Sequence, residues 1–511
     1  MHAQRHPRFA LKTLAAATVA CYAPLAHANP SGGTVVAGSA TMQQQGNNLV
    51  VTNTPGAIIN WQSFSIGQNE LTRFVQQGAS SAVLNRVTGQ DPSKILGQLQ
   101  SNGKVFLINP NGIVFGQGAQ VDVAGLVAST LNISDEDFRA GRMRFEGGQT
   151  GSVRNAANIT TASGGFVYLI APNVENNGVV VSPKGEILLA AGSSVELVDG
   201  VDTSLRVRIK APAGEALNVG QLIAEQGRIG VFAAAIRQQG LVSANRAEIG
   251  EGGKIVFKAS RDVTLAAGSK TEAQGGEVKI DAAQAAAVDG AIDVSNAAGK
   301  GGQAQVLGER VAVDGRIDAS GRDGGGTILV GGDYQGSNAA VRNADYTRLG
   351  TNAWLNADAT EKGDGGKIVA WADQDTSAAG RISARGGQAG GNGGFAEVSG
   401  KRNLDFHTVV DLSAERGQRG KLLLDPTDFV VDSSNVGVIF SASADVMLQA
   451  DQDVIFDATA GNAATSYNVS VTADRDIDIR SGATLSSSGG TVTLGATRDI
   501  LIGGRSAPIP T

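Results

Sequence analysis

The feature that most constrains the fold of this chain is a repeated unit in which two glycines precede a run of alternating strand residues. The pairs of glycines lie at 164–165, 252–253, 275–276, 301–302, 325–326, 365–366, 393–394 and 489–490. Between 252 and 393, successive pairs are separated by steps of 23, 26, 24, 40 and 28 along the chain. Periods of this length are typical of repeat architectures, in which each unit is one layer of a stack. The long step predicts one inserted loop, around Tyr334 to Tyr346.

A closer match defines the unit. Residues 252–265 align without gaps to residues 489–502, and the second half of the unit recurs at 450–456 and 473–479. Apolar side chains alternate with polar ones within each half, which is typical of short strands with one buried face. One such coil cannot bury its own apolar face, but stacked coils can. The sequence therefore predicts an all-β, right-handed parallel β-helix of roughly 20 coils, about 100 Å long.

The composition agrees with thin, similar layers. Glycine accounts for 70 of 511 residues and aromatic residues for only 5%. We expect repeats from 164 to 425 and a second repeat segment from 426 to 511, because Lys421 to Val431 breaks the pattern. Arg475-Asp476 and Arg498-Asp499 recur between strands, and we expect a solvated polar corner there in preference to an ion-pair ladder.

The start of the chain, residues 1–28, is typical of a secretory signal. Arg5, Arg8 and Lys12 precede a short apolar stretch, and Ala26-His27-Ala28 is a small-residue cleavage site that leaves Asn29 first. The predicted signal contains the only cysteine, Cys21, which we do not expect to carry lipid. The cleaved chain has 39 basic and 48 acidic residues, a formal charge of −9, and one histidine. These counts exclude disulfides and zinc fingers, and they argue against nucleic acid as a partner.

Residues 29–163 have a different pattern. A polar, strand-like start predicts capping strands over the open end of the stack. Short helices are predicted at Pro92–Leu99, with Asp91 as N-cap, and at Ser134–Gly141. Between them, Asn109-Pro110-Asn111-Gly112-Ile113 joins two apolar runs. Proline fixes one backbone angle and Asn-Gly tolerates positive φ, so a tight, rigid turn that folds the strand back on itself is expected here.

Several motifs between Val50 and Asp137 occur in the order known from one protein family. They are Phe64-Ser65-Ile66-Gly67, Asn85-Arg86-Val87-Thr88-Gly89, residues 91–97, Asn109 to Ile113, and residues 123–130. This region resembles the N-terminal secretion domain of filamentous haemagglutinin-like exoproteins of Gram-negative two-partner secretion. An Asn-Pro-Asn-Leu motif that many members carry is absent from its expected place at 76–80.

The resemblance implies how the chain is exported. Signal-dependent machinery would carry it across the inner membrane. A dedicated outer-membrane barrel transporter with periplasmic recognition domains would then pass it unfolded, and the β-helix would form outside. Asn109, Pro110, Asn111, Gly112 and Ile113 would support the secretion-competent domain. The implied protein is a secreted or surface-bound adhesin with an unknown receptor, and a haem-binding exoprotein of the same type is an alternative.

Residues that could support catalysis are few. His407 lies near Asp405 on one predicted strand, where a surface histidine is expected. A β-helical enzyme acting on polysaccharide, the alternative from another class, would need clustered carboxylates, with candidates Asp281, Asp289, Asp293, Asp314 and Asp318. These lie at predicted corners, where aspartate is common. An autotransporter passenger is a third possibility. We expect no catalytic residue, cofactor or metal.

Overall fold

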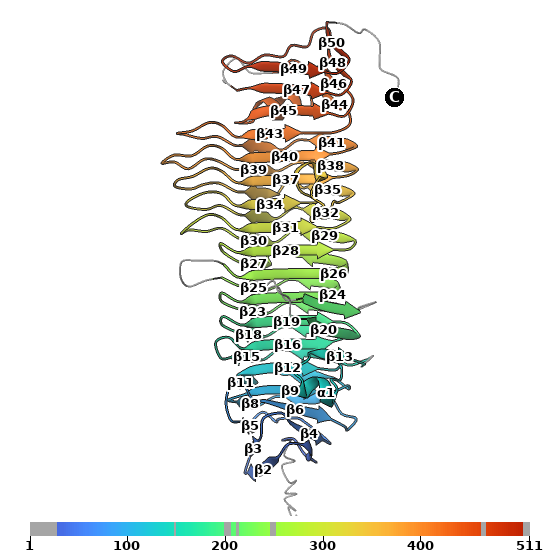
Figure 1. Cartoon of the computed structure of the whole chain (residues 1–511), viewed down its shortest axis with the longest axis vertical. Helices are drawn as coiled ribbons and strands as arrows, with labels where there is room; N and C mark the ends of the chain where they lie inside the picture. The colour runs from blue at the N-terminus through green and yellow to red at the C-terminus, as the bar shows by residue number, and fades with distance from the viewer. Residues whose placement is uncertain are drawn as a thin grey trace, which may run out of the picture.

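The computed structural model describes residues 28–147, 150–198, 206–210, 214–245, 252–460 and 467–503. Over these residues the chain forms an elongated stack of β-coils that rises from its N-terminal end to its C-terminal end (Figure 1). The described residues form about 17 turns. Neighbouring coils pair in parallel along almost the whole stack. The parallel β-helix predicted from the repeats is therefore confirmed.

Each typical coil has three strands, which stack on their counterparts in the next coil. The first column consists of β4 (Ala57–Trp61), β6 (Ala82–Val87), β9 (Lys104–Ile108), β12 (Gly125–Ser129), β16 (Phe166–Ala171), β19 (Glu186–Ala191), β24 (Arg228–Gln238), β26 (Lys254–Leu265), β28 (Glu277–Ala282), β31 (Gln303–Leu307), β34 (Thr327–Val330), β37 (Lys367–Ala372), β40 (Phe395–Gly400), β43 (Lys421–Leu424), β45 (Asp445–Ala450), β47 (Val469–Ala473) and β49 (Val492–Ala496).

The second column continues the same sheet around a bend, and the long strands β24 and β26 span both columns. Its other members are β7 (Ser93–Ile95), β10 (Ile113–Phe115), β14 (Ser152–Asn155), β17 (Asn173–Asn176), β22 (Glu215–Asn218), β29 (Ala285–Val288), β32 (Arg310–Val313), β35 (Tyr346–Leu349), β38 (Asp375–Ala378) and β41 (Asn403–Phe406).

The third column is a separate sheet. It contains β2 (Ala40–Gln45), β3 (Asn48–Asn53), β5 (Leu71–Val75), β8 (Gln98–Ser101), β11 (Gln120–Val123), β15 (Asn158–Thr161), β18 (Val179–Val181), β23 (Gln221–Ile223), β25 (Leu241–Ser243), β27 (Lys270–Glu272), β30 (Ala291–Asp293), β33 (Arg316–Asp318), β36 (Trp354–Asn356), β39 (Arg381–Ser383) and β42 (Val409–Asp411).

The N-terminal end of the stack is closed by antiparallel strands. Strand β1 (Thr34–Ala37) runs antiparallel to β4, and β2 forms an antiparallel hairpin with β3. Strand β3 then pairs in parallel with β5, the first coil of its sheet. These strands satisfy backbone groups that an open end would leave unpaired. They are the capping strands predicted from the sequence.

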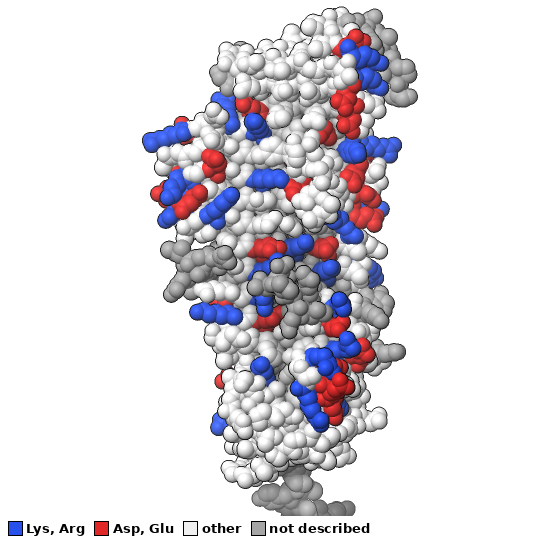
Figure 2. All heavy atoms as spheres, viewed as in Figure 1, with Lys and Arg blue, Asp and Glu red and all other residues white. Residues whose placement is uncertain are grey.

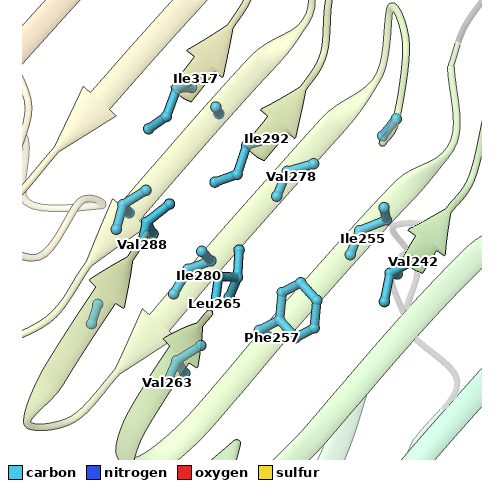
Figure 3. Close-up of a cluster of buried hydrophobic side chains, with 14 of the residues drawn as sticks. Val242, Ile255, Phe257, Val263, Leu265, Val278, Ile280, Val288, Ile292 and Ile317 are labelled. Atoms are coloured by element: carbon cyan, nitrogen blue, oxygen red, sulfur yellow. The ribbon is translucent and has the colours of Figure 1, made fainter. Parts of the chain in front are cut away.

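The core is a column of small and medium apolar side chains inside the coils. Ile255 on β26 lies in register with Val278 on β28, and Phe257 lies in register with Ile280 (Figure 3). Because alternate residues of a strand point to opposite faces, the same alternation repeated in every coil produces a continuous apolar interior. One buried cluster extends from Leu49 to Ile479.

Glycines stack where the third column turns into the first. A Cβ atom at Gly326 would lie 2.1 Å from the carbonyl oxygen of Gly302, and one at Gly366 would lie 2.1 Å from that of Gly326. The same close approach recurs at Gly185, Gly227, Gly276, Gly302, Gly394 and Gly420. No side chain fits at this spacing, which explains why the glycine pairs mark each repeat.

Local sequence signals were right in one helix and wrong in the other. Helix α1 (Asp135–Arg139) lies within the predicted range, and the Ser134 side chain caps its start. Residues 92–99 are not helical, because they supply strand β7 and the start of β8. Ile95 and Leu99 are fully buried in the core, so packing between coils outweighs the local capping signals. The predicted insertion is present, with a short 3₁₀ turn, η1 (Tyr334–Gly336), between β34 and β35.

In the last coils the first column continues, whereas a different sheet takes the place of the second and third columns. Strands β44 (Phe429–Val431), β46 (Val454–Phe456), β48 (Asp476–Ile479) and β50 (Asp499–Ile502) form their own parallel sheet, and helix α2 (Val436–Phe440) lies between β44 and β45. The apolar interior continues into this part. A separate repeat segment from residue 426 stays a prediction. The predicted signal up to His27 and the residues after Gly503 lie outside the described part.

Charged corners in these coils are more ordered than predicted. Arg475 donates to the Asp453 carboxylate of the preceding coil, with Nε 2.6 Å from Oδ1, and Arg498 binds Asp476 in the same way. Both aspartates are buried. The expectation of a solvated corner was therefore wrong here, because the offset of one coil places each arginine over a buried carboxylate. Within the described residues, no helix is long and apolar enough to cross a membrane.

Candidate functional site

The Asn109 to Ile113 segment is a corner between two strands of one coil. It joins β9 to β10, but these strands do not pair with each other. Strand β9 pairs in parallel with β6 and β12, and β10 pairs with β7 and β14. The prediction that the strand folds back on itself was wrong. The turn instead bends the chain from one column of the solenoid to the next, and Gly112 has the positive φ that was expected.

Asn109 fixes the corner from inside. Its side chain is fully buried and its amide donates to the carbonyl oxygen of Asp91 and to the Ser93 hydroxyl, both at 3.0 Å. Its own oxygen accepts from the backbone N–H of Asn111 at 3.0 Å. The backbone N–H of Asn109 donates to the carbonyl oxygen of Ser129 in the following coil. One asparagine therefore connects the corner to the coils on both sides.

The tip of the corner faces solvent. Pro110 and Asn111 are exposed, whereas Gly112 and Ile113 are buried. The Asn111 amide donates to the carbonyl oxygen of Gly89 at 2.8 Å, so even the tip is fixed to the preceding coil. The corner thus combines a buried anchor with an exposed, rigid surface.

The other sequence motifs pack around the same coils. Asn85 is buried on β6 and accepts a hydrogen bond from the Trp61 indole at 2.9 Å. A Cβ atom at Gly89 would lie 2.1 Å from the carbonyl oxygen of Gln62, and one at Gly97 would lie 2.1 Å from that of Gly67. These motif glycines are required by close backbone contacts. At the site of the missing motif, Gln76 is buried and its amide donates to Ser101 and Lys104.

Sequence reasoning predicted helix α1 but missed that it packs, with a small sheet, on the outside of the solenoid. Helix α1 and an antiparallel sheet of β13 (Arg144–Glu146), β20 (Ser194–Val198) and β21 (Arg206–Lys210) cover the outer face of the first column. A second apolar cluster lies beneath, in which Phe106 of β9 contacts Phe138 of α1. Runs that are apolar at every position, such as 166–171, were the available signal, because they indicate strands buried on both faces.

Arg86 fastens this cover to the solenoid. Its guanidinium donates to the Asp135 carboxylate and to the backbone oxygen of Ile133, both at 2.9 Å. Asp137 lies in α1, and hydrogen bonds from Arg142 and, to a lesser extent, Ser134 hold its pKa below its ordinary value. The arginine of the Asn-Arg-Val-Thr-Gly motif thus links β6 to an element that follows β12 in the chain.

The predicted cleavage region adjoins the cap. Asn29 is buried, its amide donates to the carbonyl oxygen of Asn47, and its oxygen accepts from the Thr72 hydroxyl. The backbone N–H of Ala28 donates to Glu70 at 2.9 Å. Ala26 lies outside the described residues.

The candidate catalytic residues do not converge on one site. His407 and Asp405 form an exposed pair, 2.8 Å apart. Asp293 and Asp318 lie in register on the third column, whereas Asp281 lies on the first. Asp289 and Asp314 follow strands of the second column, and Asp314 accepts hydrogen bonds from Asn352. Among the residues that the structure describes, no group of three or more His, Cys, Asp or Glu side chains is placed to hold a metal ion.

Comparisons with known proteins agree with the motif pattern. A family model described as the TPS secretion domain matches residues 26–246. The heme/hemopexin-binding protein of Haemophilus influenzae is 34% identical over 211 residues, which cover 39% of this chain and 23% of that protein. The filamentous hemagglutinin of Bordetella pertussis is 32% identical over 129 residues, covering 22% of this chain and 3% of that protein.

A solved structure is also similar to this chain. The HMW1 secretion domain of Haemophilus influenzae superimposes with a TM-score of 0.61 at 35% identity, covering 78% of this chain and all of that one. The chain spans less than a quarter of the length of the curated relatives that it matches. The similarity therefore covers only one part of each of those relatives.

Proposed function

This chain belongs to the exoproteins of two-partner secretion, and on that premise we propose that a dedicated outer-membrane transporter exports it and that it acts outside the cell as an adhesin-like protein. The observation that carries the proposal is the corner at 109–113, where a fully buried asparagine connects successive coils beneath an exposed tip. In this proposal, only the coils next to the corner need to be formed when the transporter meets it, and the rest of the chain crosses unfolded.

The two parts of the corner have separate roles in this proposal. Asn109 supports the fold, because removing its side chain leaves the Ser93 hydroxyl and two backbone groups without their partner. Pro110 and the tip residue Asn111 provide the surface that the transporter meets. The N-terminal end is nearly uncharged, with only Glu70, Arg73 and Arg86 between residues 28 and 90. On the face shown in Figure 2 this end is likewise almost free of charged groups.

Export assays with single substitutions test the proposal. The full chain is produced together with its transporter, and its amounts in the medium and the periplasm are compared. We expect Asn109→Ala to lower both export and protease resistance, by about tenfold in the exported fraction. Pro110→Ala should lower export while the purified protein keeps wild-type protease resistance. Gln43→Ala, which removes an exposed side chain of β2, is the control. Unchanged export of both corner variants contradicts the proposal.

The function outside the cell is proposed as binding and not as catalysis. The relatives are named for haemagglutination and for binding heme and hemopexin. A long, repetitive column suits contact with a surface. Haem binding is the second candidate, because one relative is named for it. A haem titration followed by its absorption spectrum separates the two, and repeating it on His407→Ala tests whether the histidine of the described residues is a ligand.

A further inference from the structure

Residues 333–345, here called the strap, interrupt the regular coils and lie on the outer face of the first column. The strap follows β34 and contains η1, which contacts β37. Beneath it, Leu329, Val369 and Trp371 form a small apolar cluster with Val341 of the strap. All three are at most 4% exposed, although they point away from the core of the solenoid. The strap therefore covers an apolar surface that the repeat itself does not bury.

The strap is held down through Gln335. The backbone N–H of Gln335 donates to both carboxyl oxygens of Glu397, at 3.0 and 3.2 Å, and its side-chain amide donates to Asp425 at 2.9 Å. Gln335 has φ 49° and ψ 27°, in the left-handed region that residues other than glycine rarely occupy. Contacts to Glu397 and Asp425 hold this conformation.

Glu397 is a carboxyl group that is fully buried on the outer face of β40. The nearby cation, Lys367 of β37, binds Asp333 of the strap. Asp425, which follows β43, is the acidic neighbour, and Asp451 and Asp474 lie beyond it. An ionised Glu397 would therefore have no cation of its own and would face other acidic side chains. These surroundings favour the neutral form of Glu397. Burial raises the pKa of Glu397 to about 8; the hydrogen bonds from the Gln335 N–H and Ser399 and the charge of Lys367 lower it, and Asp425 adds to the rise.

We propose that the strap is a proton-dependent cover, which closes over Leu329, Val369 and Trp371 while Glu397 is neutral and loosens when that carboxyl ionises. Ionisation places a charge in an apolar setting next to Asp425, and opening of the strap relieves this by admitting water. Opening exposes Leu329, Val369 and Trp371 to water.

The direction of the pH effect follows from the raised pKa. The closed strap binds the Glu397 proton more tightly than the open strap, in which the group titrates near its ordinary value. Closure is therefore most stable below about pH 5 and is lost as the pH rises toward 8. Burial also raises the pKa of Asp425, so it acts in the same direction. Asp333 acts oppositely: burial disfavours its ionisation, but hydrogen bonds from Asn338 and Lys367 outweigh this and lower its pKa. Closure should therefore weaken again in strong acid.

Amide hydrogen exchange of the purified full chain tests the cover. Peptides from 333–345 are followed by mass spectrometry from pH 5 to 9, and each rate is divided by the intrinsic rate at that pH. We expect the opening constant of the strap to rise about tenfold per pH unit between 5 and 8 and then to level off. In Glu397→Gln the same profile should be nearly flat. Glu361→Gln, on an exposed loop, should keep the wild-type slope.

Two results would overturn the proposal. One is a flat profile in the wild-type protein, which is decisive even if Glu397→Gln fails to fold. The other is a wild-type slope that persists in a folded Glu397→Gln protein. Circular dichroism of each variant establishes whether it has folded, and export of the chain is not needed for either result.

Discussion

Buried amide side chains determine how neighbouring coils align. Asn155 donates to Asn176 at 2.8 Å, Asn176 to Asn218 at 2.7 Å, and Asn218 to Gln238 at 2.7 Å. The four amides replace apolar residues at one inward position of the second column, next to the turn into the third. Each must meet its counterpart in the next coil, since an unpaired buried amide is costly. The ladder therefore fixes the register that apolar packing alone leaves loose.

Asn176→Ala should break this ladder in its middle. The substitution removes the acceptor of the Asn155 amide and the donor to the Asn218 oxygen, and we expect the free energy of unfolding to fall by roughly 3 kcal/mol. The neighbouring Asn177→Ala removes an exposed side chain and should change stability little. Urea unfolding of both variants measures the difference, and equal midpoints would contradict a structural role for the ladder.

At the same scale, the sequence predicted some side-chain roles and missed others. The turn at Asn109 was identified because proline and Asn-Gly have local preferences. The partners of Asn109 belong to the preceding and the following coil, so local preferences could not reveal them. The pairing of Arg475 with Asp453 likewise joins two coils, and only the stacked structure defines which residues then meet.

Which residues form strands or helices in this protein depends more on packing between stacked coils than on the intrinsic propensities of the residues. The repeat of glycine pairs and alternating apolar residues predicted the coils, because the same side-chain constraints recur in each layer. Residues 92–99 carry good helix signals yet form strands, since Ile95 pairs in register with Phe115 of the next coil. Helix α1 was predicted, but its packing with β13 on the outside of the solenoid was not, because the partners are outward-facing residues of distant coils.

Gly366→Ala tests stacking at the level of one coil. Its Cβ atom would lie 2.1 Å from the backbone carbonyl oxygen of Gly326, and neither atom can rotate away. We expect a loss of at least about 3 kcal/mol in stability and new protease cleavage near this coil. Gly437→Ala meets no atom within 4 Å and is the matched control. Equal melting temperatures would show that the glycine column is dispensable.

The whole molecule is a single apolar column capped at its N-terminal end. Nearly every strand pairs with a strand from the next coil, so the structure grows by adding layers in chain order. The sequence predicted the repeat and the fold class correctly. It also predicted roughly 20 coils, whereas the described residues form about 17 turns. The cleaved chain is predicted to lack cysteine, so no disulfide can close a loop in the periplasm. This fits a chain that crosses the outer membrane unfolded and forms its layers afterwards.

A disulfide placed between two coils tests this order of events most directly. Ser377 and Asp405 are exposed register partners on β38 and β41, and their side chains are in contact at 3.1 Å. Ser377→Cys/Asp405→Cys should form a disulfide in the oxidising periplasm and close a loop that an unfolded chain cannot carry through a narrow pore. We expect the exported fraction to fall at least tenfold, to recover with reductant, and to stay normal in either single variant. Undiminished export of the oxidised double variant would contradict transport as an unfolded chain.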